Sequence, residues 1–238
     1  MKHNRKIVCI IQARTGSTRL PNKVLRDLEG KPLLLRVLDR VLESKLINHI
    51  VVATTTNPKD KAIVDLVKGY SPRVGTFRGS EEDVLDRYYQ AAREAKADVV
   101  VRVTSDNPLI DPDVMDKNIR ELLADDSLEL VSNHIGKMTY PRGLDVESLP
   151  FSTLEKLAKT TTEPIDREHV TIHIKRFPDK FKWKTTANGT DLSSHRWTVD
   201  QEEDFQFAVE VYRRLYTKNP HFRMNDVLKL LQENPELI

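Results

Sequence analysis

An α/β fold with a doubly wound, mostly parallel sheet is predicted by two observations on this 238-residue chain. Segments of strand length alternate with segments that repeat apolar residues at helical spacing, from Ile7 to Ser132. The first strand, at 7–11, is apolar throughout, which is typical of a strand buried on both faces of a parallel sheet. A chain of this length can bury a sizeable core, in one large domain or two small ones.

Start signals place the helices between these strands. Pro32 precedes the first helical pattern, Asn57-Pro58 the second and Asp111-Pro112 the fourth, and these residues suit an N-cap or a first turn. Ser80 opens the third pattern with a sequence that resembles a capping box. The expected strands are 7–11, 50–53, 74–77, 99–103 and 128–132, and the expected helices are 33–46, 58–68, 80–96 and 112–123.

The alternation ends after Ser132, where turn residues become frequent. We therefore expect one domain over 1–238, with a lid or accessory segment at about 133–190. A stretch in which Lys and Thr alternate, at 181–187, suits a half-exposed edge strand. The other elements expected after this point are a short strand at 196–199 and helices at 152–159, 164–177, 200–217 and 224–232.

Composition excludes several classes of protein. The formal net charge is +2, which argues against a broad nucleic-acid footprint. Cys9 is the only cysteine and lies in the first apolar strand, so we expect a buried, inert thiol. The apolar stretches are too short for a membrane span or for the core of a signal peptide. The expectation is a cytoplasmic protein that binds neither nucleic acid nor a membrane.

A basic loop follows the first strand. It carries Arg14, Arg19 and Lys23, with the small residues Gly16 and Ser17 between them. Loops at the carboxyl ends of strands bind ligands in α/β sheets, and cations with accessible backbone N–H groups bind anions. A polyphosphate is the expected ligand, although the loop matches neither the P-loop nor the dinucleotide fingerprint. A solvated loop without function is the alternative.

Polar residues also follow the later strands. Thr54, Gly79 and Ser80 come after the second and third strands, where helix capping is an alternative explanation. Asp106 follows the fourth strand and Asp200 the strand expected at 196–199. Mg²⁺ prefers one or two carboxylates with phosphate oxygens, so both aspartates are candidate metal ligands. The alternatives are an Asx turn for Asp106 and a helix N-cap for Asp200.

A second polar group lies within the accessory segment. His169 and His173 would share one helical face, but E-H-x-x-x-H is not the H-E-x-x-H zinc motif. We interpret this face, and the turn-rich stretch before it, as surfaces that touch the substrate, with an ordinary polar loop as the alternative. The candidate substrate-binding residues are Tyr140, Arg142, Asp145, Glu168 and His169.

The segment Q-A-R-T-G-S-T-R-L-P-N-K-V-L resembles the N-terminal motif of the cytidylyltransferases that activate sugar acids, the CMP-Kdo and CMP-acylneuraminate synthetases. Five further motifs occur in order and resemble more closely the branch of the spore coat polysaccharide biosynthesis protein SpsF, to about Tyr212. These motifs are R-G-S-E-E-D-V-L-D-R-Y, V-R-V-T-S-D-N-P-L-I-D-P, P-R-G-L-D-V-E, R-E-H-V-T and R-W-T-V-D-x-x-E-D.

The resemblance implies a Rossmann-like nucleotidyltransferase fold of the GT-A-like type, which uses CTP and Mg²⁺ and releases pyrophosphate. It also implies a homodimer, a sugar acid as acceptor and a place in surface polysaccharide biosynthesis. Asn107 and the stretch from Tyr140 to Glu147 depart from the sequences of the CMP-Kdo synthetases. The resemblance therefore supports the use of CTP more strongly than the identity of the sugar. A nucleotide-sugar glycosyltransferase and a non-catalytic nucleotide-binding module are the alternatives.

The same resemblance assigns roles to individual positions. The nucleotide-binding residues would be Ala13, Arg14, Gly16, Ser17, Arg19, Lys23, Thr54, Gly79 and Ser80, of which the last three hold cytosine and ribose. Arg14, Lys23 and Asp106 would be catalytic, and Asp106 and Asp200 would hold the metal.

Overall fold

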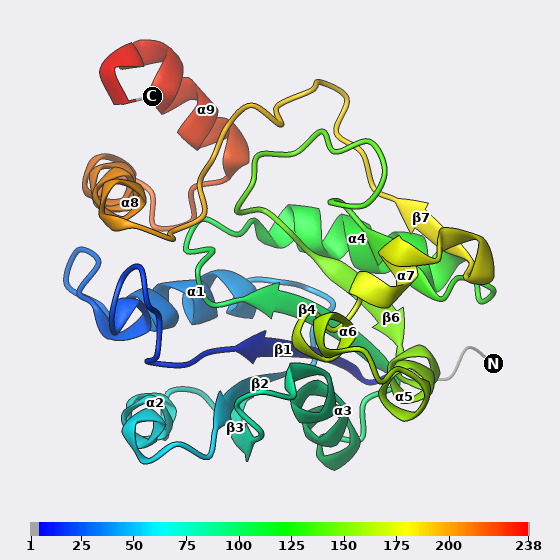
Figure 1. Cartoon of the computed structure of the whole chain (residues 1–238). Coiled ribbons are helices and arrows are strands. Elements are labelled where there is room, and N and C mark those ends of the chain that lie inside the picture. Colours follow the sequence, from blue (N-terminus) through cyan, green and yellow to red (C-terminus); the bar gives the residue numbers. More distant parts are fainter. Residues whose placement is uncertain (1–4, 238) are drawn as a thin grey trace.

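A seven-stranded sheet runs through the computed structural model, which describes residues 5–237 (Figure 1). The strand order is β3-β2-β1-β4-β6-β5-β7, and every strand is parallel to the others except β6, which is antiparallel to both neighbours. The predicted doubly wound, mostly parallel sheet is therefore confirmed. The strands are β1 Ile7–Gln12, β2 His49–Thr55, β3 Val74–Gly79, β4 Val99–Thr104, β5 Leu130–Ser132, β6 Glu147–Pro150 and β7 Trp183–Thr185.

The chain reverses its direction across the sheet between β1 and β4. It builds outward from β1 through β2 to β3, and then returns to place β4 on the other side of β1. Gln12 at the end of β1 pairs with Thr104 at the end of β4, so the two carboxyl ends lie side by side. In open α/β sheets this reversal is where ligands bind.

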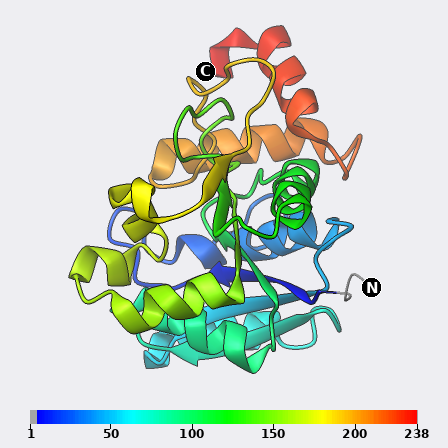
Figure 2. The same cartoon turned by 90° about the vertical axis from the view of Figure 1, so that its right-hand side faces the viewer.

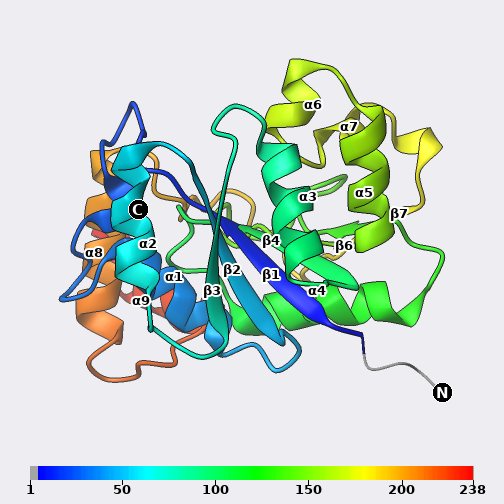
Figure 3. The ribbon, with the colours of Figure 1, turned by 90° about the horizontal axis from the view of Figure 1, so that it is seen from below.

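Helices cover both faces of the sheet. Side chains alternate along β1, so that Ile7, Cys9 and Ile11 pack with α1, α2, α4, α8 and α9, while Val8 and Ile10 pack with α3, α5 and α7 (Figure 3). The α-helices are α1 Leu33–Leu42, α2 Lys61–Val67, α3 Val84–Glu94, α4 Pro112–Ala124, α5 Phe151–Thr160, α6 Pro164–Glu168, α7 Ile172–Arg176, α8 Glu202–Leu215 and α9 Met224–Glu233. The 3-10 turns are η1 Lys23–Leu25, η2 Pro58–Asp60, η3 Pro178–Lys180 and η4 Pro235–Leu237.

The segment 133–190 is built into the sheet. It supplies β6, which was not predicted, as well as β7 and the helices α5 to α7 (Figure 2). β6 is only four residues long and follows a turn-rich loop, so its sequence carries no strand period, and pairing with β4 and β5 makes it a strand. The expected edge strand is present as β7, which ends the sheet.

Three helix predictions were wrong in detail. The helix expected at 164–177 is two short helices, because Val170 between them has a φ of 55°. His169 and His173 therefore do not share a helical face. The helix expected at 33–46 ends earlier, since α1 stops at Leu42. The helix expected at 80–96 begins later: α3 starts at Val84, because Asp83 is its N-cap and its side chain accepts from the N–H of Asp86.

The region before α8 also differs from the prediction. Residues 196–199 form no strand, and the only pairing described there is an isolated bridge between Arg142 and Arg196. α8 begins at Glu202 with Gln201 as its N-cap, so Asp200 does not cap it. Among residues 5–237, no helix has the length and apolar character needed to cross a membrane. Cys9 is fully buried, as predicted, and burial raises the pKa of its thiol.

Candidate active site

A cleft of about 810 Å³ opens at the carboxyl ends of β1 and β4. The loop after β1 forms one wall, and the start of α3 with α6 forms another. This is the position that the reversal of the sheet predicts for a ligand. The predicted site residues that line the cleft are Ala13, Arg14, Ser17, Arg19, Lys23, Asp106, Glu168, His169 and Asp200.

Other predicted residues lie outside this lining. Thr54 is fully buried in β2, and its hydroxyl has no hydrogen-bond partner among residues 5–237. Ser80 Oγ accepts from the N–H of Asp83, 3.0 Å away, in the turn that leads into α3. Gly16 adjoins Glu81 of the cleft wall, and Gly79 ends β3. Tyr140, Arg142 and Asp145 lie in the loop before β6.

A buried carboxylate holds the basic loop in place. Asp60 Oδ1 accepts from both the N–H and the hydroxyl of Thr15, each 2.7 Å away, and its other oxygen accepts from the Thr55 hydroxyl. Burial alone would raise the pKa of Asp60, but these hydrogen bonds from Thr55 and Thr15 outweigh it and lower the pKa. Asp60 was missed because nothing in its local sequence distinguishes it from a surface helix residue.

Five charged residues are linked by ion pairs at the cleft, and we call them the cleft cluster: Arg19, Lys23, Asp106, Arg196 and Asp200, of which all but Arg196 line the cleft. Lys23 Nζ lies 3.4 Å from Asp106 Oδ2 and 3.3 Å from Asp200 Oδ1. It also donates to the carbonyl of Val199 at 2.7 Å. The ammonium group is thus held between two carboxylates far apart in the sequence, one after β4 and one in the segment before α8.

The two aspartates are held differently. Asp106 accepts from the hydroxyl of Thr104, and its backbone carbonyl accepts from the N–H of Val199 at 2.8 Å. Asp200 lies 3.1 Å from Arg19 Nη2 and 2.9 Å from Arg196 Nη2. Burial raises the pKa of Asp200, but its hydrogen bond from Arg196 and the nearby Lys23 lower it overall, so the carboxylate is charged at neutral pH.

Gln201 performs the N-cap role that the sequence suggested for Asp200, and its capping box is completed by Asp204. The Asp204 carboxylate accepts from the N–H groups of Asp200 and Gln201, at 2.8 and 3.0 Å. The Asp200 side chain is therefore free to turn into the cleft.

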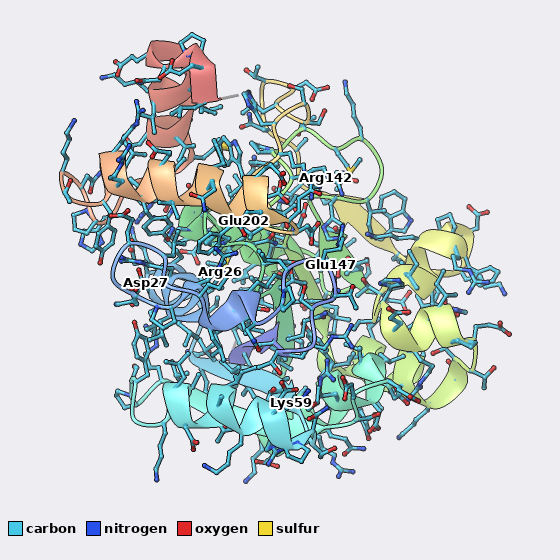
Figure 4. All side chains as sticks on the ribbon, turned by 60° about the vertical axis from the view of Figure 1, so that its left-hand side comes forward. Arg26, Asp27, Lys59, Arg142, Glu147 and Glu202 are labelled. Atoms are coloured by element: carbon cyan, nitrogen blue, oxygen red, sulfur yellow. The ribbon has the colours of Figure 1, made fainter. Side chains whose placement is uncertain are left out.

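Downstream of the basic loop, Arg26 Nη2 lies 2.9 Å from Glu202 Oε1 and its guanidinium lies over the Phe205 ring, so the loop is anchored to α8 (Figure 4).

A second group of polar residues, here called the buried cluster, was missed by the sequence analysis: Arg102, His134, Glu147, Thr171 and Lys175. Glu147 of β6 is fully buried at its centre (Figure 4). Its carboxylate lies 2.9 Å from Arg102 Nη1, 3.0 Å from His134 Nε2 and 3.7 Å from Lys175 Nζ, and accepts from the Thr171 hydroxyl at 2.7 Å. Arg102 also reaches Gln12 in the cleft wall, at 3.4 Å.

Two carboxylates of the cleft cluster offer oxygen atoms that suit a divalent cation. No group of three or more His, Cys, Asp or Glu side chains within residues 5–237 could hold a metal ion. Asp106 and Asp200 approach the same ammonium group, and two carboxylates completed by phosphate oxygens and water suit Mg²⁺. The residues present therefore fit a metal that is bound together with a phosphate ligand.

The sheet order, the cleft at the reversal point and the cations around paired carboxylates define an α/β nucleotide-binding protein of the nucleotidyltransferase type. Comparison with known families agrees, because the cytidylyltransferase family model matches residues 8–233. The chain belongs to the cytidylyltransferase family and is a CTP-dependent nucleotidyltransferase.

Two relatives resemble the chain over nearly its whole length, and a third resembles about half of it. A protein of Methanocaldococcus jannaschii is 37% identical over 98% of this chain and 93% of its own. The spore coat polysaccharide biosynthesis protein SpsF of Bacillus subtilis is 30% identical over 97% and 95%. The 3-deoxy-manno-octulosonate cytidylyltransferase of Geobacter metallireducens is 35% identical, but only over 52% of this chain and 48% of its own.

Solved structures share the fold. A cytidylyltransferase from Leptospira borgpetersenii superimposes with a TM-score of 0.93 at 32% identity, over 98% of this chain and 97% of that one. A CMP:2-keto-3-deoxy-manno-octonic acid synthetase complexed with CTP matches with a TM-score of 0.67 at 18% identity, over 88% and 99%. The second comparison concerns the fold alone.

Proposed function

We propose that the protein transfers CMP from CTP to a hydroxyl group of a small acceptor and releases pyrophosphate. One observation carries the proposal: Lys23 lies between Asp106 and Asp200 at the reversal point of the sheet. This arrangement offers a cation and two anions at the place where a nucleoside triphosphate and its metal must meet. The match of the cytidylyltransferase family model to residues 8–233 supports the choice of nucleotide.

In the proposed reaction, the acceptor oxygen forms a bond to the α-phosphorus of CTP, and the bond to the oxygen that bridges to the β-phosphate breaks. Arg14 and Arg19 are 50% and 66% exposed, so their guanidinium groups can turn to the phosphate chain. Lys23 would neutralise the charge that builds on the leaving pyrophosphate. Positioning and charge neutralisation supply most of the rate in phosphoryl transfer.

Mg²⁺ is the proposed cofactor, with Asp106 and Asp200 as its protein ligands. When bound, it would neutralise phosphate charge and increase the acidity of the acceptor hydroxyl. Lys23 must then exchange its carboxylate partners for phosphate oxygens, which its position between the two aspartates allows.

A sugar acid or a related compound is the proposed acceptor, and surface polysaccharide biosynthesis is the proposed setting. Both rest on the similarity to SpsF and to a sugar-acid cytidylyltransferase. A glycosyltransferase would use an Asp-x-Asp motif for its metal. Here Asp111-Pro112-Asp113 starts α4, and Asp111 is buried as the N-cap that accepts from the N–H groups of Asp113 and Met224. That observation disfavours the glycosyltransferase.

Pyrophosphate release tests the proposal. Purified protein with Mg²⁺ and CTP should release pyrophosphate when one member of a panel of sugar acids, sugar phosphates and polyol phosphates is present. The matched controls omit the acceptor or replace CTP by a nucleotide-sugar. Binding of CTP without turnover across the panel would favour the non-catalytic module instead, and cleavage of the nucleotide-sugar would favour a glycosyltransferase.

We also propose that the protein is a homodimer assembled through the segment 133–190. Met138 and Ile165, both in this segment, are large apolar side chains that are 48% and 47% exposed. Their contact with a second copy would remove apolar surface from water. Light scattering at micromolar concentration should give twice the monomer mass, and a monomer with full activity would contradict the proposal.

A further inference from the structure

Arg87 of α3 is the most buried cation in the cleft, and the mechanism above gives it no role. It lines the cleft and is only 2% exposed. Its Nη1 donates to the backbone carbonyl of Ser80 and, at 3.5 Å, to that of Glu81. Within residues 5–237, its Nε has no hydrogen-bond partner and no carboxylate lies within ion-pair distance. A buried charge that is left in this state costs free energy.

Two other buried arginines show what a purely structural role looks like in this chain. Arg36 and Arg40 have no described ion pair either, but Nε of each donates to a backbone carbonyl at 2.9 Å. Each guanidinium also lies over an aromatic ring, Tyr216 at 4.1 Å and Phe222 at 4.4 Å. Neither residue lines the cleft. Among the described residues, Arg87 has neither an acceptor for its Nε nor an aromatic ring under its guanidinium, and it is the one of the three arginines that lines the cleft.

The surrounding motif holds this guanidinium in place. A Cβ on Gly79 would lie 2.9 Å from Phe77 Cε1 and 3.0 Å from Arg87 Cγ, so only glycine leaves room for the arginine stem. Asp83 caps α3 and is itself held by Arg167, whose Nε lies 3.0 Å from its carboxylate. The motif from Arg78 to Tyr88 therefore fixes both the backbone and the side chain of Arg87.

We infer that Arg87 is a specificity-determining residue that binds the cytosine ring of CTP, by donating to the ring oxygen O2 and the adjacent nitrogen N3. The inference rests on the proposed function. A guanidinium is donor-only and has a planar fork, which matches two neighbouring acceptors. Cytosine offers acceptors at both O2 and N3, whereas uracil carries a hydrogen at N3 and would oppose one donor with another.

Burial distinguishes the base from the phosphates as the partner. The cations assigned to the triphosphate are more exposed, with Arg14 at 50%, Arg19 at 66% and Lys23 at 12%. Arg87 lies deeper, and the apolar side chain of Val84 lines the cleft beside it, which suits a flat ring. Burial makes the largest contribution and lowers the pKa of Arg87, and the nearby Tyr88, Asp60 and Glu81 offset it only in part.

The test compares the binding of CTP and UTP by titration calorimetry. Wild-type protein should prefer CTP. Arg87→Met keeps most of the stem that packs on Gly79 but removes the donors, so the preference for CTP over UTP should fall at least tenfold. Arg87→Lys keeps the charge without the fork and should lose the preference to a similar degree. Thermal melts of both variants confirm that they are folded.

Arg14→Met is the matched control, because it removes an exposed cation of the same cleft. The Arg14→Met variant should weaken the binding of CTP and of UTP by equal factors and leave the ratio of the two affinities unchanged. Arg87 variants that weaken both nucleotides equally would show a phosphate contact, and unchanged binding would show a structural role, so either result overturns the inference. Wild-type protein that binds no CTP would instead refute the proposed function.

Discussion

The cleft cluster and the buried cluster use the same kinds of side chain in opposite ways. In the cleft cluster, Lys23 lies 3.3–3.4 Å from two carboxylates that remain partly exposed. In the buried cluster, Glu147 is fully buried and has four partners. Partly solvated ion pairs can exchange a partner for a ligand at small cost, whereas a buried carboxylate cannot lose one without leaving a charge uncompensated.

This difference separates the proposed reaction site from the residues that would support it. The buried cluster joins β4 and β6 to α7, and Arg102 carries the connection to Gln12 in the cleft wall. The cleft cluster joins the basic loop to the ends of β4 and of the segment before α8. Substitutions in the buried cluster should therefore lower the stability of the fold, and substitutions in the cleft cluster should lower turnover.

The largest expected effect is on stability. Glu147→Gln leaves Arg102 and Lys175 against a neutral amide in a buried position, and breaking such a pair costs about 3–5 kcal/mol. Chemical denaturation should show this loss of unfolding free energy. Lys159→Gln, which removes an exposed helical ion pair with Glu155, is the control and should change the unfolding free energy far less. Equal stability of the two variants would remove the distinction between the clusters.

Turnover should be most sensitive to Asp106. Asp106→Asn removes a charged ligand of the proposed metal and a partner of Lys23, and the rate of pyrophosphate release should fall about 100-fold or more. The melting temperature should stay near that of wild type, because the carboxylate is partly exposed. A variant that is destabilised as much as Glu147→Gln would show that Asp106 is structural.

Asp200→Asn should have a smaller effect of the same kind. Asp204, and not Asp200, accepts from the N–H groups before α8, so the substitution should leave the helix intact. Turnover should fall about tenfold, equivalent to about 1.4 kcal/mol, and added Mg²⁺ should restore part of it. Activity measured against Mg²⁺ concentration tests whether Asp200 is a ligand of the metal. Full activity with an unchanged Mg²⁺ requirement would leave Asp106 as the only protein carboxylate on the metal.

Acid should destabilise the protein through the buried cluster. Burial raises the pKa of Glu147, but His134 and Arg102 outweigh it and hold the pKa well below its ordinary value of 4.5. A carboxylate with a lowered pKa in the folded state stabilises the fold above pH 4.5, and this contribution is lost as the pH falls below that value. Denaturation at pH 6 and below pH 4.5 should show a steeper loss for wild type than for Glu147→Gln. Identical pH profiles would contradict this assignment.

Local patterns in the sequence predicted much of the molecule. The apolar segments predicted β1 to β5. Start signals predicted a helix at 112–123, and α4 begins at Pro112 and ends one residue later than predicted. Most of the charged residues predicted for the site, among them Arg14, Lys23 and Asp106, line one cleft. These successes share a cause, because strand burial, helix period and the carboxyl edge of a parallel sheet are all expressed over short stretches of chain.

The tertiary structure alone decided which polar residue meets which. Asp60 holds Thr15 across 45 residues, and Glu147 meets Arg102 across the same separation, with no local signal at either end. Asp200 was a plausible N-cap by sequence, but Gln201 is the N-cap of α8 and the Asp200 side chain lines the cleft. Arg87 is an ordinary helical arginine in the sequence, and its missing counter-charge is visible only once its neighbours are known. Charge compensation acts through space and has no period along the chain, so the sequence by itself could not determine it.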